Sequence, residues 1–290
     1  MRYFLDPSTL FVRGVFRAAC IDTADEIRTV TTLLLHTVPG DFGAVGRQRE
    51  LARVVAEAGI GGAYAGLLTT VPVQHLCVLQ YDHLTIFLVA GMDDNPAHAP
   101  CTTGIIVFSR EGMEDTALKE LLSVAGEARS LALKTAGYST PGTSPDGVIV
   151  ACEGAITPGD GRKAEDAGHV REAIQKGVPE AFRRSRAGGT HRAPGFFIFS
   201  RFKGEHWVEW TPDDCPYYPC HFAGQRCDFC YCPFYPCHDE RLGEWANGSN
   251  GGRVWNCARC TLLHEPRVAD YLNRYPESSL KELMHLAQRQ

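Results

Sequence analysis

The sequence of 290 residues lacks the long apolar run of a membrane span, and it lacks a surplus of positive charge. A transmembrane helix needs ~20 consecutive apolar residues. A secretory signal would begin with a basic region and a long apolar run, whereas the chain begins MRYFLDP, with Asp6 and Pro7 where that run would be. The formal net charge of −5 gives no general attraction to nucleic acid or anionic lipid. We therefore expect a cytoplasmic protein with no membrane partner and no nucleic-acid partner.

The sequence is rich in cysteine, and eight of its 12 cysteines lie between residues 215 and 260. Because thiols stay reduced in the cytoplasm, this cluster indicates metal binding, with a secreted disulfide scaffold as the rival interpretation. Residues 227–230 and 257–260 are Cys-x2-Cys pairs, and each pair places two sulfurs on one tight turn. Two such pairs separated by a loop are typical of a zinc ribbon.

We predict metal ligands among the thiols and imidazoles of this segment: Cys215, Cys220, His221, Cys227, Cys230, Cys232, Cys237, Cys257, Cys260 and His264. They exceed one tetrahedral site, so we expect one or two zinc ions, and the sharing of ligands between ions stays open. The spacing of Cys227, Cys230 and Cys232 leaves an iron–sulfur cluster as the alternative.

The first two thirds of the chain alternate short apolar runs with amphipathic helical patterns. Residues 10–20 suggest a strand, a turn and a strand, and residues 103–109 and 148–152 suggest buried strands. Residues 115–136 and 169–184 show the apolar stripe of amphipathic helices. This pattern predicts an α/β or α+β domain with a mixed sheet and flanking helices, although the strand order does not follow from it.

The composition changes near residue 185, where a short basic and glycine-containing stretch follows the last long helical pattern. We therefore expect a large domain over residues 1–184, a linker over 185–194 and a small cysteine-rich domain over 195–290 that is stabilised by metal and ends in a helix. We find no internal repeat in the sequence.

Two parts of the chain resemble known families. The cysteine motifs within residues 197–275 closely resemble the cysteine-rich small domain found beside cobalamin-salvage enzymes. The first part is similar to the adenosylcobinamide amidohydrolase (CbiZ) family, and the segments that carry this similarity occur in family order. They are residues 66–72 (GLLTTVP), 89–96 (VAGMDDNP), 127–133 (EARSLAL), 143–146 (TSPD) and 148–152 (VIVAC). The sequence departs from the family pattern at residues 20–23, at Gly104 and at Pro145.

The resemblance implies hydrolysis of the aminopropanol amide of adenosylcobinamide, a corrinoid, to give adenosylcobyric acid in cobalamin salvage. Amide hydrolysis needs an activated water, a stabilised oxyanion and a proton for the leaving amine. We predict catalytic groups in two loops, at Asp93, Asp94, Asn95 and Asp146. We predict substrate contacts at Thr69, Thr70, Glu127, Thr143 and Ser144. The alternative is a corrinoid-binding or transfer protein with a zinc module and no hydrolysis, and the oligomeric state is not derivable.

Overall fold

The chain forms two compact units, Tyr3–Trp210 and Thr211–Gln290. The computed structural model describes residues 2–20, 26–40, 42, 46–92, 101–138, 147–154, 163–187, 194–200, 204–210, 215, 217–230, 232–247, 253–275 and 277–289. Within these residues, no helix is long and apolar enough to cross a membrane.

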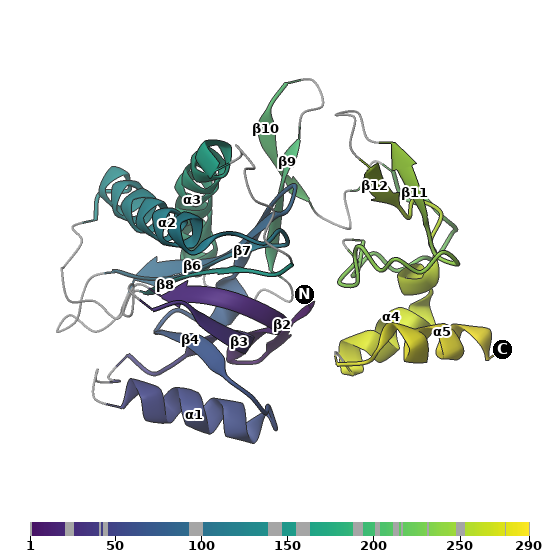
Figure 1. The fold of residues 1–290 in the computed structure, drawn as a ribbon, viewed down its shortest axis with the longest axis horizontal. Helices are drawn as coiled ribbons and strands as arrows, with labels where there is room; N and C mark the ends of the chain where they lie inside the picture. The colour runs from purple at the N-terminus through teal and green to yellow at the C-terminus, as the bar shows by residue number, and fades with distance from the viewer. Residues whose placement is uncertain are drawn as a thin grey trace. The chain divides into compact units, whose positions relative to one another are not determined.

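The large unit contains one mixed sheet and three α-helices in its described residues (Figure 1). Along the sheet the order is β10-β9-β5-β6-β7-β8-β2-β3-β4, with β1 paired to β2. The pairs β3–β4, β5–β9 and β7–β8 are parallel. The elements are β1 (Arg2–Asp6), β2 (Thr9–Cys20), β3 (Arg28–Thr37), α1 (Arg47–Glu57), β4 (Tyr64–Thr69), η2 (Val73–His75), β5 (Cys77–Tyr81), β6 (Leu84–Met92), β7 (Cys101–Ser109), α2 (Asp115–Thr135), β8 (Gly147–Cys152), α3 (Lys163–Arg186), β9 (Gly195–Ser200) and β10 (His206–Trp210).

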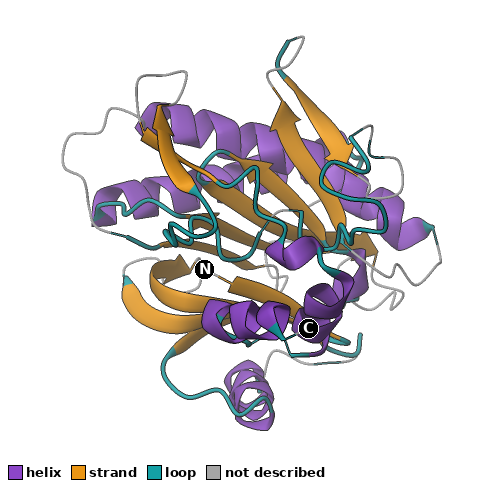
Figure 2. Cartoon of the chain, turned by 90° about the vertical axis from the view of Figure 1, so that its right-hand side faces the viewer, coloured by secondary structure: helices purple, strands orange, loops and turns teal. Residues whose placement is uncertain are grey.

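The predicted mixed sheet with flanking helices is confirmed, and its helices cover two outer faces. Figures 1 and 2 show α2 and α3 on one side of the strands and α1 on the other. Alternate side chains of the strands point to opposite faces. Thus Ile105 and Val107 of β7 pack with α2 and α3, whereas Ile106 packs toward Leu33 and Leu35 of β3. The sheet therefore folds over on itself, and an apolar core fills the space between its two halves.

The fold of the sheet on itself is centred on β2. The sequence predicted a strand, a turn and a strand here, and this was wrong, because β2 is one strand of 12 residues. Its register with β3 shifts between Arg13 and Phe16. A β-bulge of this kind bends a strand and raises its twist without ending it. The bend lets β2 pair with β3 along most of its length and with β8 over its last residues.

The boundary between the units differs from the expected linker at residues 185–194. Helix α3 continues to Arg186, and β9 pairs in parallel with β5 of the large sheet. Strand β10 pairs in turn with β9. Residues 195–210 therefore belong to the large unit, and the small unit begins at Thr211 rather than at Gly195. The linker expectation failed because a basic, glycine-containing sequence does not reveal that the next strand pairs with a distant one.

The two halves of the sheet approach closely at glycines. A Cβ atom on Gly147 would lie 2.1 Å from Cδ2 of Leu67, and one on Gly104 would lie 2.5 Å from Cδ1 of Leu35. Both leucines are buried in the core between the halves, so neither can move aside freely. Glycine at these positions is thus explained by packing.

Substitution of Gly147 is expected to destabilise the large unit. We expect Gly147→Ala to lower the free energy of unfolding by about 1–3 kcal/mol, since an inserted methyl group displaces Leu67. The matched control is Gly168→Ala, because Gly168 is exposed in α3 and a Cβ there meets no atom within 4 Å. That change should be neutral or stabilising by up to about 1 kcal/mol. Equal denaturant midpoints for the two variants would contradict the close approach.

The small unit has a modest apolar core whose buried members lie at residues 262–284. Leu262, Leu263, Val268, Leu272, Leu283 and Met284 form this core. Its helix α5 begins with a capping box between Ser279 and Glu282, which satisfies free backbone N–H groups at the start of the helix. The elements are β11 (Glu244–Asn247), β12 (Arg253–Asn256), η3 (Leu262–His264), α4 (Pro266–Arg274) and α5 (Leu280–Gln288).

Candidate active site and candidate metal centre

The two loops predicted to carry catalytic groups leave the large sheet at one edge. Strand β6 ends at Met92, opposite Cys101, where β7 begins. Strand β8 runs parallel to β7, and Gly147 at its start lies opposite Gly104. The chain segments before β7 and before β8 therefore enter the sheet from the same side. The predicted site residues in these segments lie outside the described residues; they are Asp93, Asp94, Asn95, Thr143, Ser144 and Asp146.

Two predicted substrate contacts, Thr69 and Thr70, lie at the end of β4 and differ in accessibility. The Thr70 hydroxyl is 3.0 Å from the hydroxyl of Thr102, which lies at the start of β7. Thr70 therefore lies at the edge where the two loops leave the sheet. Thr69 is 1% exposed, and its hydroxyl accepts a hydrogen bond of 3.1 Å from the Val71 amide. We therefore correct the expectation for Thr69, whose hydroxyl is engaged in the turn.

The end of α3 adds described side chains to this edge. A Cβ on Gly91 of β6 would lie 3.2 Å from the Ser185 hydroxyl, so the end of α3 lies beside the end of β6. The Tyr138 ring stacks on Phe182 with centroids 4.6 Å apart. The Arg186 guanidinium lies over both rings and donates a hydrogen bond to the Tyr138 hydroxyl. The sequence did not single out either residue: Arg186 fell within the expected linker at 185–194, and Tyr138 was not recognised as a partner of the distant Phe182.

Two further residues lie elsewhere in the large unit: Glu127, a predicted substrate contact, and Cys152, a thiol with no predicted role. Glu127 is exposed in the middle of α2, so its side chain faces solvent, and the substrate contact expected there stays a prediction. Cys152 is 2% exposed, and burial raises the pKa of its thiol. A buried thiol with a raised pKa is a poor nucleophile.

A buried polar chain between β2, β3 and α1 also escaped the sequence analysis. The Thr9 hydroxyl is 2.7 Å from Nδ1 of His36, and Nε2 of His36 is 3.4 Å from the Glu50 carboxylate. Burial lowers the pKa of His36. The order of groups is that of a nucleophile, a base and an orienting acid. However, Thr9 is 1% exposed and His36 is 6% exposed, so these bonds stabilise the packing of α1 on the sheet.

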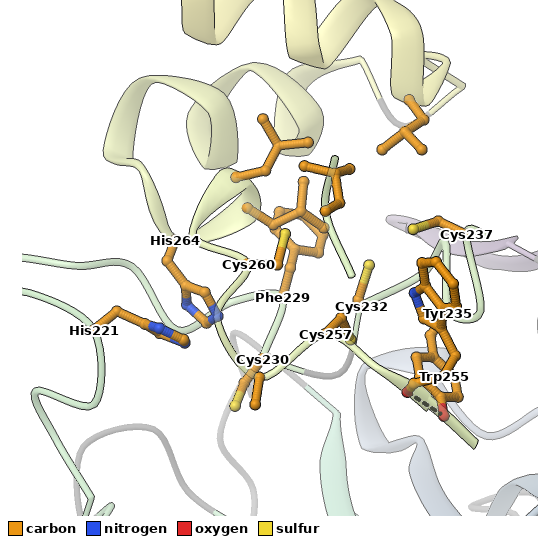
Figure 3. Close-up of a pocket in the computed structure, with 15 residues that line it drawn as sticks. His221, Phe229, Cys230, Cys232, Tyr235, Cys237, Trp255, Cys257, Cys260 and His264 are labelled. Atoms are coloured by element: carbon orange, nitrogen blue, oxygen red, sulfur yellow. Dashed lines mark hydrogen bonds between the residues drawn. The ribbon is translucent and has the colours of Figure 1, made fainter. Parts of the chain in front are cut away.

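In the small unit, all the predicted metal ligands are described, and most of them line one cavity of about 200 Å³. Figure 3 shows His221 and His264 next to each other on one side of this cavity. Their ring centroids are 4.4 Å apart. Tyr235, Cys237 and Trp255 lie on the other side (Figure 3). The cysteines that line the cavity are Cys230, Cys232, Cys237, Cys257 and Cys260.

The described part of segment 215–247 has almost no apolar interior. Its one buried residue is Gln225, which is 5% exposed. The Gln225 amide nitrogen donates to the Cys220 and Cys227 sulfurs at 3.2 and 3.3 Å. Its oxygen accepts from the backbone amides of His221 and Phe222. Sulfur atoms held by a buried amide, in a segment whose apolar side chains are at most partly buried, are typical of a fold that depends on a metal.

Burial and neighbouring thiolates favour the protonated form of these cysteines. Burial raises the pKa of the Cys230 thiol to about 11, and Cys230 lines the cavity although the residue as a whole is exposed. Burial likewise raises the pKa of Cys232 to about 12. The thiolates that raise the pKa of Cys230 further are Cys220, Cys227 and Cys215. Those that act on Cys232 are Cys260, Cys257 and Cys237.

The thiols of the described residues lie near one another but are not arranged as complete metal sites. Across the described ranges, no three cysteine, histidine, aspartate or glutamate side chains are placed as a metal site. None of the described cysteines forms a disulfide. Thiol and imidazole groups are the ligands that zinc prefers, so the donor chemistry fits zinc, and binding requires the thiols to converge and to lose their protons.

Comparison with known proteins adds the identity of the large unit. Residues 2–190 match the family model described as adenosylcobinamide amidohydrolase. The chain belongs to this family. Its enzyme class is therefore that of hydrolases acting on an amide bond. Residues 206–287 match a second family model, described as a cysteine-rich small domain.

Curated relatives agree with both matches. An adenosylcobinamide amidohydrolase of Methanosarcina mazei is 30% identical over 191 residues, which cover 61% of this chain and 96% of the relative. An uncharacterized protein of Methanocaldococcus jannaschii is 44% identical over 78 residues, covering 25% of this chain and 66% of the relative. A probable cobalt-factor III C(17)-methyltransferase of Methanothermobacter thermautotrophicus is 47% identical over 70 residues, covering 22% of this chain and 18% of the relative.

Proposed function

We propose that the large unit hydrolyses the amide that joins the aminopropanol arm of adenosylcobinamide to its corrin, giving adenosylcobyric acid for cobalamin salvage. The proposal is carried by the family match over residues 2–190. The shared edge of the segments that precede β7 and β8 supports it, because catalytic groups are commonly placed on loops that a rigid scaffold positions.

The proposed chemistry uses the polar residues of the two loops. A carboxylate of Asp93, Asp94 or Asp146 takes a proton from water as the water oxygen attacks the amide carbon. Asn95 donates a hydrogen bond to the developing oxyanion. The carbon–nitrogen bond then breaks, and the proton passes to the leaving aminopropanol nitrogen.

Substrate contacts are proposed at the same edge. The hydroxyls of Thr70, Thr143 and Ser144 would bind the amide side chains of the corrin. The stacked Tyr138 ring beside Arg186 would contribute an aromatic surface at this edge, since aromatic rings bury large apolar areas.

An assay of the purified full chain with adenosylcobinamide tests this proposal. We expect adenosylcobyric acid and free aminopropanol in equal amounts, separated by chromatography and identified by mass. Binding of adenosylcobinamide without product would instead select a corrinoid-binding or transfer protein. The absence of both binding and product would overturn both interpretations.

We also infer that the small unit binds zinc, at sites made from the cysteines of residues 215–260. Support comes from the nearly absent apolar interior of the described part of segment 215–247 and from the Gln225 amide held against two sulfurs. When bound, zinc would cross-link turns that lack an apolar core. Elemental analysis of the purified chain is expected to find zinc. Iron with acid-labile sulfide would select a cluster instead, and the absence of both would overturn metal binding.

A further inference from the structure

The cysteine-rich segment contains one pattern twice, which corrects the expectation of no internal repeat. Residues 215–221 read CPYYPCH and residues 232–238 read CPFYPCH, so the two are identical at six of seven positions. Each is followed by a Cys-x2-Cys pair, at residues 227–230 in the first copy and 257–260 in the second. The hairpin of β11 and β12 accounts for the longer spacing of the second copy.

The backbone folds the two copies in the same way. In each CPxYPCH segment, the tyrosine amide donates to the carbonyl of the first cysteine at 3.1 Å, from Tyr218 to Cys215 and from Tyr235 to Cys232. In each Cys-x2-Cys pair, the second cysteine amide donates to the first cysteine carbonyl, at 3.2 Å in the first copy and 2.9 Å in the second. The two copies thus contain four tight turns. Each turn has two cysteines in it or within two residues of its end.

A tyrosine hydroxyl connects the two turns within each copy. The Tyr218 hydroxyl accepts a hydrogen bond of 3.3 Å from the Gly224 amide, just before Cys227. The Tyr235 hydroxyl donates a hydrogen bond of 3.1 Å to the Trp255 carbonyl, just before Cys257. Each CPxYPCH turn is therefore connected to the Cys-x2-Cys pair of its own copy, and these bonds do not connect it to the pair of the other copy.

Side-chain contacts group the sulfurs in the same way. The Gln225 amide nitrogen lies 3.2 Å from the Cys220 sulfur and 3.3 Å from the Cys227 sulfur, so it brings both turns of the first copy together. In the second copy, all four cysteines line the cavity of about 200 Å³, whereas Cys230 is the only cysteine of the first copy among its lining residues. Trp255 lies two residues before Cys257, just as Gln225 lies two residues before Cys227. Trp255 is 4% exposed, and its indole N–H lacks a hydrogen-bond partner within the described residues. A buried donor beside four thiols is placed to meet a thiolate sulfur, as the Gln225 amide does.

We propose that the small unit holds two tetrahedral zinc ions, one for each copy of the repeat. The first ion takes Cys215, Cys220, Cys227 and Cys230, and the second takes Cys232, Cys237, Cys257 and Cys260. This assignment rests on the zinc binding inferred above. It replaces the zinc-ribbon pairing, in which residues 227–230 and 257–260 would share one ion.

The assignment leaves the histidines outside both ligand sets. Nδ1 of His264 is 2.8 Å from the Arg226 carbonyl oxygen, and the His264 carbonyl accepts from the Arg226 amide at 2.8 Å. His264 thus connects the chain after the second copy to the first Cys-x2-Cys turn. Four thiolates saturate a tetrahedral zinc ion and leave no position for water, so both sites are structural.

Pairs of cysteine substitutions in the full chain distinguish the two assignments. The same-copy variant Cys220→Ser with Cys230→Ser is expected to lose one ion and keep the other. The cross-copy variant Cys230→Ser with Cys260→Ser is expected to keep both ions but to release both more readily to a chelator, because each site keeps three of its four thiolates. Zinc-ribbon pairing predicts the reverse pattern. The control Cys20→Ser, in β2 of the large unit, should keep both ions.

A protection experiment on the unaltered chain avoids any variant that fails to fold. Zinc is removed, one equivalent is returned, free thiols are alkylated, and the protected cysteines are identified by mass spectrometry. We expect protection of one copy or the other, each as a complete set of four. Protection of residues 227, 230, 257 and 260 together, or a single ion bound by the intact chain, would overturn the assignment. If the unaltered chain binds no zinc at all, the inferred zinc binding itself is overturned. That outcome is distinct from zinc binding with a different grouping of cysteines.

Discussion

Removal of zinc by a chelator is expected to unfold the small unit and to leave the large unit folded. A structural zinc ion contributes about 10–16 kcal/mol of binding free energy to a small domain. The described part of segment 215–247 buries only Gln225, so little apolar burial there can replace that energy. Limited proteolysis should therefore cut within residues 211–290 after chelation and spare residues 3–210.

Tryptophan fluorescence can follow this change in one unit alone. The four tryptophans divide evenly, with Trp207 and Trp210 in the large unit and Trp245 and Trp255 in the small one. In a Trp207→Phe, Trp210→Phe chain, emission should shift to the red on chelation, since Trp255 is 4% exposed before it. Returned zinc should restore the emission. An unchanged spectrum with all metal removed would show that the small unit folds without it.

Replacement of the catalytic carboxylate is expected to lower kcat by about 10²–10⁴-fold, the usual contribution of general acid–base catalysis. We expect this loss in at least one of Asp93→Asn, Asp94→Asn and Asp146→Asn. Asparagine keeps the size of the side chain and removes its ability to take a proton, so KM should change much less than kcat.

The control for these variants lies at the opposite end of β6. Asp82 is an exposed carboxylate in the turn before Leu84, whereas Asp93 follows Met92 at the other end. The φ of Asp82 is 43°, a backbone conformation that asparagine adopts readily. Asp82→Asn should keep full activity. Full activity in all three test variants would exclude these loops as the source of the base.

Periodicity in the sequence predicted the elements that bury a regular face. The stripe of Leu118, Leu121 and Leu122 predicted α2, and every member is buried. The buried strands predicted at residues 103–109 and 148–152 are β7 and β8. These predictions succeeded because helix and strand periods are local properties of the chain.

Pairing between distant segments could not be derived in the same way. Nothing in residues 195–200 indicates that this strand pairs with β5, and nothing in residues 10–20 announces that a bulge replaces a turn. Register and partner choice depend on packing across the whole sheet. The expected linker at 185–194 included Arg186, so its position in α3 was not predicted. The burial of Thr69 depends on the turn after β4, where its hydroxyl accepts from the Val71 amide.

The metal ligands show a different limit. Spacing predicted which residues bind metal, but the grouping proposed here depends on a repeat that Cys-x2-Cys pairs alone do not reveal. The clearer signal was the doubled CPxYPCH segment, visible in the sequence once the tyrosine and prolines are compared along with the cysteines.

The pairing of β9 with β5 sets a minimum length for a fragment without an open sheet edge at β5. A polypeptide that stops at residue 190, where the amidohydrolase match ends, would lack β9 and β10. The backbone groups of β5 that face β9 would then be exposed to water as an open edge, and such edges recruit strands from other molecules. Anyone who separates the amidohydrolase from its cysteine-rich companion should therefore cut after Trp210, so that the enzyme fragment stays soluble and does not aggregate.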